Sequence, residues 1–95
     1  MISEIAEPEV LDDVISNDDV TYSSKVILFN DDWHTFDEVI SQIVKATGKS
    51  FDKAQDLTHQ VHNDGKAVVY DGDMSDCLKV SSILEEISLH TQIEF

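Results

Sequence analysis

The chain reads K-V-I-L-F-N-D-D-W-H from Lys25 to His34, and this stretch decides the fold. After the lysine, its first part is a run of apolar residues with two β-branched members, as expected of a strand buried in a sheet. The run stops at Asn30-Asp31-Asp32, whose side chains hydrogen-bond their own backbone and favour a turn. A turn with three strong acceptors beside an aromatic residue and a histidine is either an ordinary loop or a site for a cationic group.

The composition indicates one small acidic domain. Its 95 residues include 20 acids against six lysines and no arginine, which gives a formal net charge of −14. Such a surface repels nucleic acids and lacks the arginine fork that clamps phosphate, so no nucleic-acid partner is expected. The charge favours a cationic ligand or a basic partner surface, and a purely solubilising role is the plain alternative.

Three features of the sequence favour a cytoplasmic protein. No run approaches the roughly 18 consecutive apolar residues of a membrane span, so no membrane association is expected. No basic segment precedes an apolar core at the N-terminus, so a secretory signal is not expected. The lone cysteine, Cys77, has no partner for an internal disulfide and falls at a core-periodic position, where it acts as a small apolar residue.

Residues 1–22 differ from the rest of the chain. They contain seven acids and no lysine, their apolar residues are scattered, and Pro8 interrupts any helix. This composition predicts a disordered acidic N-terminal extension, and it leaves open a short helix that forms on a partner.

Two helices are expected after the acceptor-rich turn. Thr35 and Glu38 form a capping box that starts the first helix, and Gly48 ends it. Ser50 caps the second helix, and Asn63-Asp64-Gly65 stops it. Apolar residues at helical spacing give these helices inward faces: Phe36, Val39, Ile40, Ile43 and Val44 in the first, then Phe51, Ala54, Leu57 and Val61 in the second.

The remaining chain predicts a strand, a helix and a final strand. Lys66–Tyr70 is the strand, Asp71-Gly72-Asp73 is a turn, and Asp73 or Ser75 caps the helix. Residues 91–95 alternate as the last strand. The inward face of the third helix comprises Cys77, Val80, Leu84 and Ile87. The order β-α-α-β-α-β predicts a single α+β domain over residues 23–95, with a three-stranded antiparallel sheet packed against helices.

The polar triplet forms one candidate site together with His62. If the second helix packs on the first strand, His62 approaches Asn30, Asp31 and Asp32. Asparagine carbonyl, carboxylate and neutral imidazole all accept hydrogen bonds, and an α-ammonium group has three donors to offer. From spacing alone, a turn-stabilising Asn-Asp pair and a surface histidine are the more frequent arrangement.

The same residues are compatible with other functions. Asp31, Asp32, His59 and His62, with His34 nearby, have the chemistry of metal ligands, so a small metal-dependent hydrolase is one alternative. No complete metal motif is present, so no metal site is expected. An acidic interaction domain without N-terminal selectivity is a further alternative. Cys77 has no basic neighbour except Lys79 and no evident source of a reactive thiolate, so no catalytic residue is expected.

Three segments resemble the ClpS adaptors of the Clp ATP-dependent protease. They are Lys25-Val-Ile-Leu-Phe-Asn-Asp-Asp-Trp33, Val39-Ile40, and Val61-His62-x-x-Gly65-Lys66-Ala67, and the resemblance covers about residues 24–95. It implies a small α+β domain that is monomeric, carries no cofactor and is not an enzyme. It also implies an adaptor that binds substrates beginning with Leu, Phe, Tyr or Trp and hands them to the AAA+ Clp unfoldase.

The resemblance assigns two groups of site residues. The family holds the substrate's α-amino group with residues that map onto Asn30, Asp32 and His62, and Asp31 stands beside them. The hydrophobic pocket maps onto Leu28, Phe29, His34, Phe36, Val39, Thr58, Val61 and Leu89. The chain departs from the family at His34-Thr35-Phe36, where Thr-Pro-Met is usual, and at Thr58, where the family has a gating methionine. These departures bear on which first residue is accepted.

Overall fold

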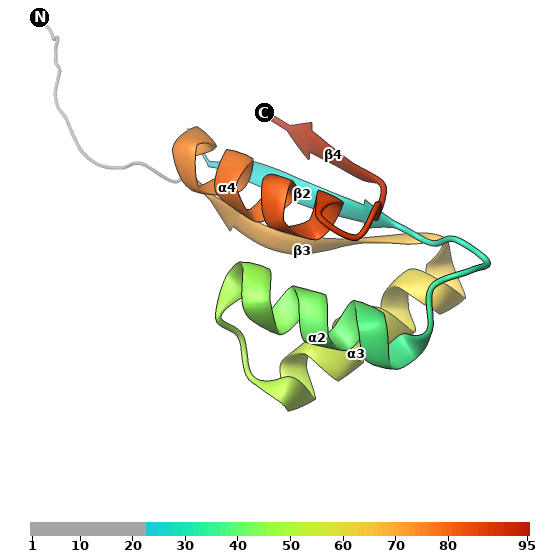
Figure 1. Cartoon of the computed structure of the whole chain (residues 1–95). Helices are drawn as coiled ribbons and strands as arrows, with labels where there is room; N and C mark the ends of the chain where they lie inside the picture. Colours follow the sequence, from blue (N-terminus) through green and yellow to red (C-terminus); the bar gives the residue numbers. More distant parts are fainter. Residues whose placement is uncertain (1–22) are drawn as a thin grey trace, which may run out of the picture.

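The computed structural model describes residues 23–95, and the expected acidic extension at residues 1–22 lies outside them (Figure 1). The helices and strands follow the expected order β-α-α-β-α-β. They are β2 (Ser24–Phe29), α2 (Phe36–Thr47), α3 (Phe51–Asp64), β3 (Lys66–Gly72), α4 (Met74–Glu85) and β4 (Thr91–Glu94). Within the described part of the chain, no helix combines the length and apolar character needed to cross a membrane.

The first strand, β2, is the centre of the sheet. The strand order is β3-β2-β4, and β2 pairs antiparallel with both neighbours, which confirms the expected antiparallel sheet. Leu28 lies opposite Ala67 on β3 and Thr91 on β4. The pairing of β2 with β3 shifts register between Val26 and Ile27. This arrangement places the end of β2, and the turn that follows it, between the starts of the other two strands.

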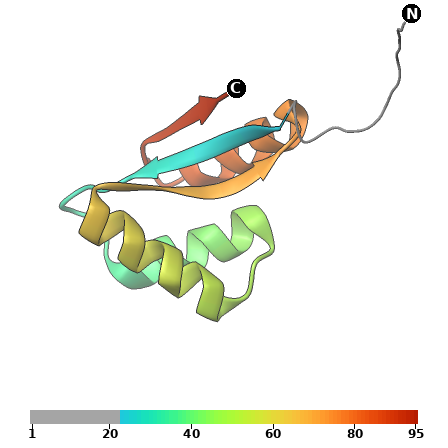
Figure 2. The same ribbon diagram turned by 180° about the vertical axis from the view of Figure 1, so that it is seen from behind.

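The helices lie on one side of the sheet. Helix α4 covers one face of the sheet, while α2 and α3 lie beside it along the β3 side; seen from behind, the other face carries no helix of residues 23–95 (Figures 1 and 2). Alternation along β2 directs Val26 and Leu28 into the core, where neither is exposed. The largest fully buried side chains come from the sheet and from two of the helices: Val26, Leu28, Ile43, Val69, Cys77 and Leu84.

The expected helix caps are present. The Thr35 hydroxyl accepts a hydrogen bond from the Glu38 amide at 3.1 Å, and the Glu38 carboxylate accepts one from the Thr35 amide at 2.8 Å. Ser50 caps α3, and Asp73, one of the two expected candidates, caps α4. Both helices that were expected to stop at a glycine do so with that glycine in the left-handed region, at φ 74° for Gly48 and 86° for Gly65.

Thr35→Ala is expected to lower the free energy of unfolding by about 1 kcal/mol. The substitution removes the acceptor for the Glu38 amide and the reciprocal geometry of the capping box. Urea denaturation measures the change, with Ser41→Ala, at an exposed position inside the same helix, as the control. A Thr35→Ala protein as stable as the control would contradict a structural role for this cap.

Four details of the sequence interpretation were wrong. Phe36 and Phe51 do not belong to the core: each is the first residue of its helix, and they are 36% and 58% exposed. Asp71 and Gly72 are not a turn, because they continue β3 opposite Lys25 and Ser24. Ile87 lies past the end of α4, although it is half-buried and packs against the core.

Candidate functional site

A pocket of about 210 Å³ opens where the turn after β2 meets α2, α3 and the segment before β4. It joins parts of the chain that are far apart in sequence. The residues that line it are Leu28, Phe29, Asn30, Asp31, Asp32, His34, Phe36, Val39, Thr58, Val61, His62 and Leu89. These are the residues assigned to the α-amino site and the hydrophobic pocket from the sequence. The fold therefore brings all of them to one place, while their roles remain predictions.

The polar rim of the pocket is built on the junction of β2 and α3. The backbone N–H of Asn30 donates to the Gly65 carbonyl at 2.9 Å, which ties the turn to the end of α3. His62 lies in the last turn of α3, at the end where a helix carries a partial negative charge. Two parts of the rim thus favour a positively charged ligand: the acceptor side chains and the helix terminus.

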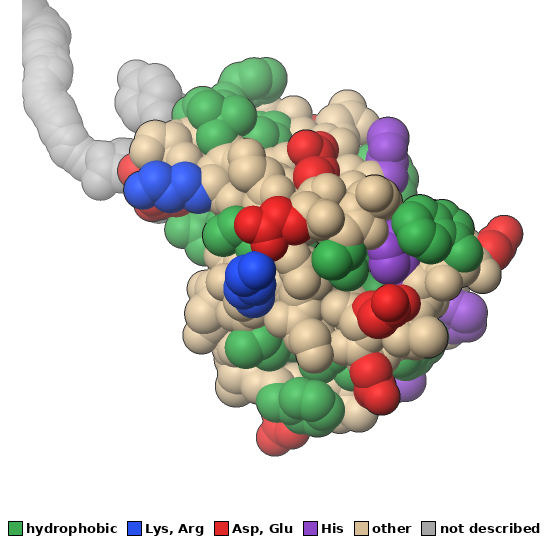
Figure 3. Space-filling model, in the orientation of Figure 1, with side chains coloured by type: hydrophobic (Ala, Val, Ile, Leu, Met, Phe, Trp, Pro, Cys, Tyr) green, Lys and Arg blue, Asp and Glu red, His purple; other side chains and the backbone are tan. Residues whose placement is uncertain are grey.

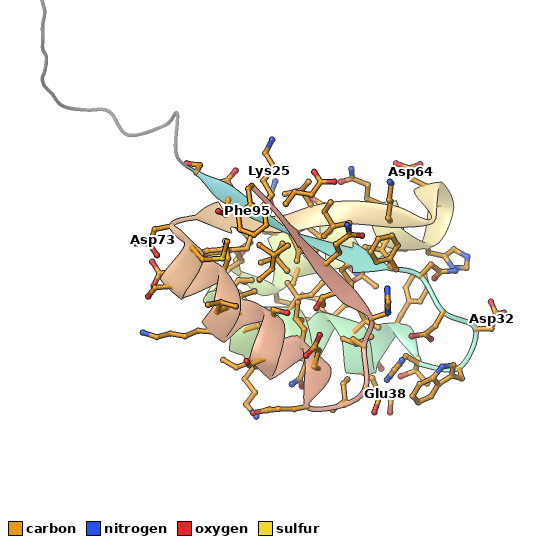
Figure 4. The ribbon with its side chains drawn as sticks, turned by 90° about the horizontal axis from the view of Figure 1, so that it is seen from above. Lys25, Asp32, Glu38, Asp64, Asp73 and Phe95 are labelled. Carbon is orange, nitrogen blue, oxygen red and sulfur yellow. The ribbon has the colours of Figure 1, made fainter. Side chains whose placement is uncertain are left out.

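The two carboxylates of the turn have different surroundings. One Asp31 oxygen accepts the backbone N–H groups of Trp33 and His34 at 3.0 and 2.9 Å, and the other lies 2.6 Å from His34 Nδ1. Burial by itself raises the pKa of Asp31, but the bonds from His34 and Trp33 outweigh it and hold the pKa below 3.8. Asp32 is exposed at the tip of the turn (Figure 4) and makes no side-chain hydrogen bond to residues 23–95. The Asp31 carboxylate is therefore occupied by hydrogen bonds within the protein, whereas the Asp32 carboxylate is available to a ligand.

The depth of the pocket is apolar. Leu28, Val61 and Leu89 line it and are each at most 4% exposed. Thr58 is also buried in this wall, and its hydroxyl donates to the Ala54 carbonyl at 2.8 Å, so the polar group is satisfied within its own helix. A ligand side chain that enters this pocket meets mostly hydrocarbon.

Histidines surround the site. Histidine side chains gather along one side of the molecule, at the right of Figure 3. The Phe36 ring lies edge-on to His59 and His62, with centroids 5.0 and 5.2 Å away. Phe36 thereby contacts the ring of His62 at the rim, and His59 stays outside the pocket lining.

The structure does not assemble the alternative metal site. Among residues 23–95, no three or more histidine, cysteine or acidic side chains are grouped as metal ligands, so Asp31, Asp32, His59 and His62 do not form one ligand set. Cys77 is fully buried in the core. Burial and the nearby carboxylates, Asp73 first among them, raise the pKa of its thiol, which keeps it protonated.

One part of the site carried no sequence signal. The ring of His34 reaches from the turn to the backbone carbonyl of Ile87, with Nε2 2.6 Å from that oxygen. A backbone acceptor in a segment so distant along the chain leaves no pattern in the sequence, because every residue carries a carbonyl.

Residues 22–92 match the family described as the ATP-dependent Clp protease adaptor protein ClpS. The chain belongs to this family, which is one of adaptors rather than enzymes. It is 49% identical over 49 residues to the ClpS adapter of Nostoc sp., a match that covers half of each chain. It is 34% identical over 68 residues to the ClpS adapter of Helicobacter hepaticus, which covers 70% of this chain and 68% of that one.

The fold agrees with a solved structure of the same family. Agrobacterium tumefaciens ClpS2, determined bound to L-phenylalaninamide, superposes with a TM-score of 0.72. The match covers 77% of this chain and 95% of that one at 20% sequence identity. This likeness confirms the α+β architecture.

Proposed function

We propose that this protein is an adaptor that binds the free N-terminal residue of substrate proteins, when that residue is bulky and hydrophobic, and delivers them to the AAA+ Clp unfoldase. The observation that carries the proposal is the junction of an apolar pocket with an acceptor rim made by Asn30, Asp32 and His62. We further propose that it acts in the cytoplasm, as a monomer and without a cofactor.

The chemistry of a protein N-terminus suits this junction. An α-ammonium group has three N–H donors, and the amide carbonyl of Asn30, the carboxylate of Asp32 and a neutral ring nitrogen of His62 offer three acceptors. The side chain of the same residue then enters the apolar wall, where burial supplies affinity. An internal or acetylated residue would leave the acceptors unpaired, which is a source of discrimination.

The family likeness supports the same ligand class. L-phenylalaninamide, the molecule in the Agrobacterium ClpS2 structure, combines a free α-amine with an aromatic side chain. The high negative charge of this chain would also attract cationic N-termini and speed their association at low salt.

The proposal is tested by peptides that differ only at their first residue. A peptide beginning with Phe is expected to bind at least tenfold more tightly than its N-acetylated copy, because acetylation removes charged hydrogen bonds worth about 1.5–3 kcal/mol each. His62→Ala is expected to weaken binding of the free peptide in the same direction. Fluorescence anisotropy measures both, with Gln60→Ala, at an exposed position of α3 outside the pocket lining, as the control.

Two results would contradict this function. Equal affinity for the free and acetylated peptides would remove the α-amino site, and peptides bound regardless of their first residue would favour an acidic interaction domain instead. Delivery is tested separately, by whether the protein accelerates degradation of a substrate with N-terminal Phe by the Clp unfoldase and its peptidase.

A further inference from the structure

We propose that His34 is a positively charged positioning residue, which holds one wall of the pocket by donating from one ring nitrogen to its own turn and from the other to a segment distant in the sequence. The two acceptors are the Asp31 carboxylate and the Ile87 carbonyl, and we call this arrangement the His34 bridge. The inference rests on the proposed function, because it concerns how the pocket of that function keeps its shape.

Hydrogen-bond chemistry fixes the charge of the ring. His34 Nδ1 lies 2.6 Å from an Asp31 oxygen, and Nε2 lies 2.6 Å from the Ile87 oxygen. A neutral imidazole has one N–H, so it would face one of these oxygens with a lone pair at hydrogen-bonding distance. Asp31 does not supply the missing proton, since its other oxygen already accepts two backbone N–H groups that stabilise the carboxylate.

The surroundings of the ring favour the same charge. The His34 side chain is 3% exposed, and burial by itself lowers its pKa, but the bonds to Asp31 and Ile87 and the negative charges of Asp31 and Glu38 raise it above 6.5. From the other elements, the Ile87 carbonyl ahead of β4 contacts the His34 ring, and His62 of α3 lines the same pocket. The Trp33 ring packs on it with centroids 3.9 Å apart, a contact that favours a cation.

The bridge connects the two segments that form one wall of the pocket. Asp31 and His34 belong to the turn between β2 and α2, whereas Ile87 belongs to the connection between α4 and β4. Leu89, two residues after Ile87, lines the pocket and is 3% exposed. Within that connection Ser88 adopts a φ of 66°, which is rare for a residue other than glycine. Because local backbone preference is against this conformation, the wall depends on the tertiary contact between His34 and the Ile87 carbonyl.

The bridge gives the two pocket histidines opposite requirements. His34 must be protonated to donate twice, and His62 must be neutral to accept from an α-ammonium group. Because the pKa of His34 is raised on folding, its stabilisation is complete below pH 6.5 and is lost as the pH rises through the raised value. Binding is therefore expected to weaken as the pH rises through the raised pKa of His34.

The protonation state is tested by NMR of the histidine ring nitrogens in the unsubstituted protein without peptide. We expect the midpoint of the His34 titration to lie above pH 6.5, with both ring nitrogens protonated below the midpoint, and Asp31→Asn to move the midpoint down. A midpoint at or below pH 6.5 would overturn the proposal. Since no peptide is present, this result stands even if the protein binds no N-terminal residue.

The effect on the pocket is tested with His34→Gln, whose amide can donate but does not titrate. Binding of the Phe peptide at pH 6.5 is expected to fall about tenfold, as for loss of a charge-assisted bond. The affinity of the parent protein divided by that of His34→Gln should fall as the pH rises, because His34 loses its proton and the glutamine does not titrate. Deprotonation of the peptide amine affects both proteins equally and cancels in this ratio. A ratio independent of pH would overturn the positioning role, and Gln60→Ala, at an exposed position of α3 outside the pocket lining, serves as the control.

Discussion

Asp32→Ala is expected to weaken binding of a peptide with N-terminal Phe by roughly 10-fold to 100-fold, the value of a charged hydrogen bond. Asp32 is the carboxylate of the turn that no group of the described chain engages, so its loss removes a contact with the ligand and little else. The free energy of unfolding should stay within about 0.5 kcal/mol of the parent protein, as for other exposed positions. Calorimetric titration and urea denaturation measure the two quantities on the same samples.

The control must separate a local contact from the overall field of an acidic protein. Asp56→Ala changes the net charge by the same amount on an exposed position of α3 outside the pocket lining. We expect it to leave affinity nearly unchanged at physiological salt, where exposed charges more than about 8 Å apart are screened. Equal losses in the Asp32 and Asp56 variants would mean that the field, rather than the turn, attracts the N-terminus.

Leu84→Ala is expected to lower the free energy of unfolding by about 2–5 kcal/mol. Leu84 is fully buried in the core on the inner side of α4, where truncation leaves a cavity among tightly packed neighbours. A domain of this size has only roughly 4–11 kcal/mol of stability, so the variant is expected to lie close to unfolding. Its urea midpoint should fall accordingly.

Leu78→Ala is the matched control, because it makes the same chemical change on the same helix at a position that is 54% exposed. We expect a loss below about 1 kcal/mol from this variant. Equal losses of stability from the two substitutions would contradict the burial of Leu84 in the core and the exposure of Leu78.

Most of the fold follows from local signals that agree with one another. The helices begin after the capping residues Thr35, Ser50 and Asp73, whose side chains accept hydrogen bonds from backbone N–H groups. Two helices end at Gly48 and Gly65, whose N–H groups donate to backbone carbonyls. Local chemistry predicted a turn at Asp71 and Gly72, but both residues continue β3. Their pairing with β2 outweighs their local preference for a turn. Phe51 shows the same limit: periodicity places it on the inner face but cannot say that the core ends before it.

Less of the site than of the fold could be predicted from the sequence. The convergence of Asn30, Asp32 and His62 required that α3 end against the turn, and spacing alone did not favour it. The family resemblance supplied this step. The sequence did not reveal that Asp31 and Asp32 have different surroundings, because the difference depends on the ring of His34 and on a backbone carbonyl in a remote segment that accepts from it.

The strand order β3-β2-β4 has a consequence for synthesis on the ribosome. The central strand emerges before either of its neighbours, and β4 is the last element to appear. Until then one edge of β2 has no strand paired with it, and the Phe29 amide has no His90 carbonyl to accept its hydrogen bond. Leu89 is also absent from the pocket lining. A nascent chain can therefore make its helices early but acquires the pocket only when translation has passed β4. An incomplete chain would thus lack one wall of the pocket.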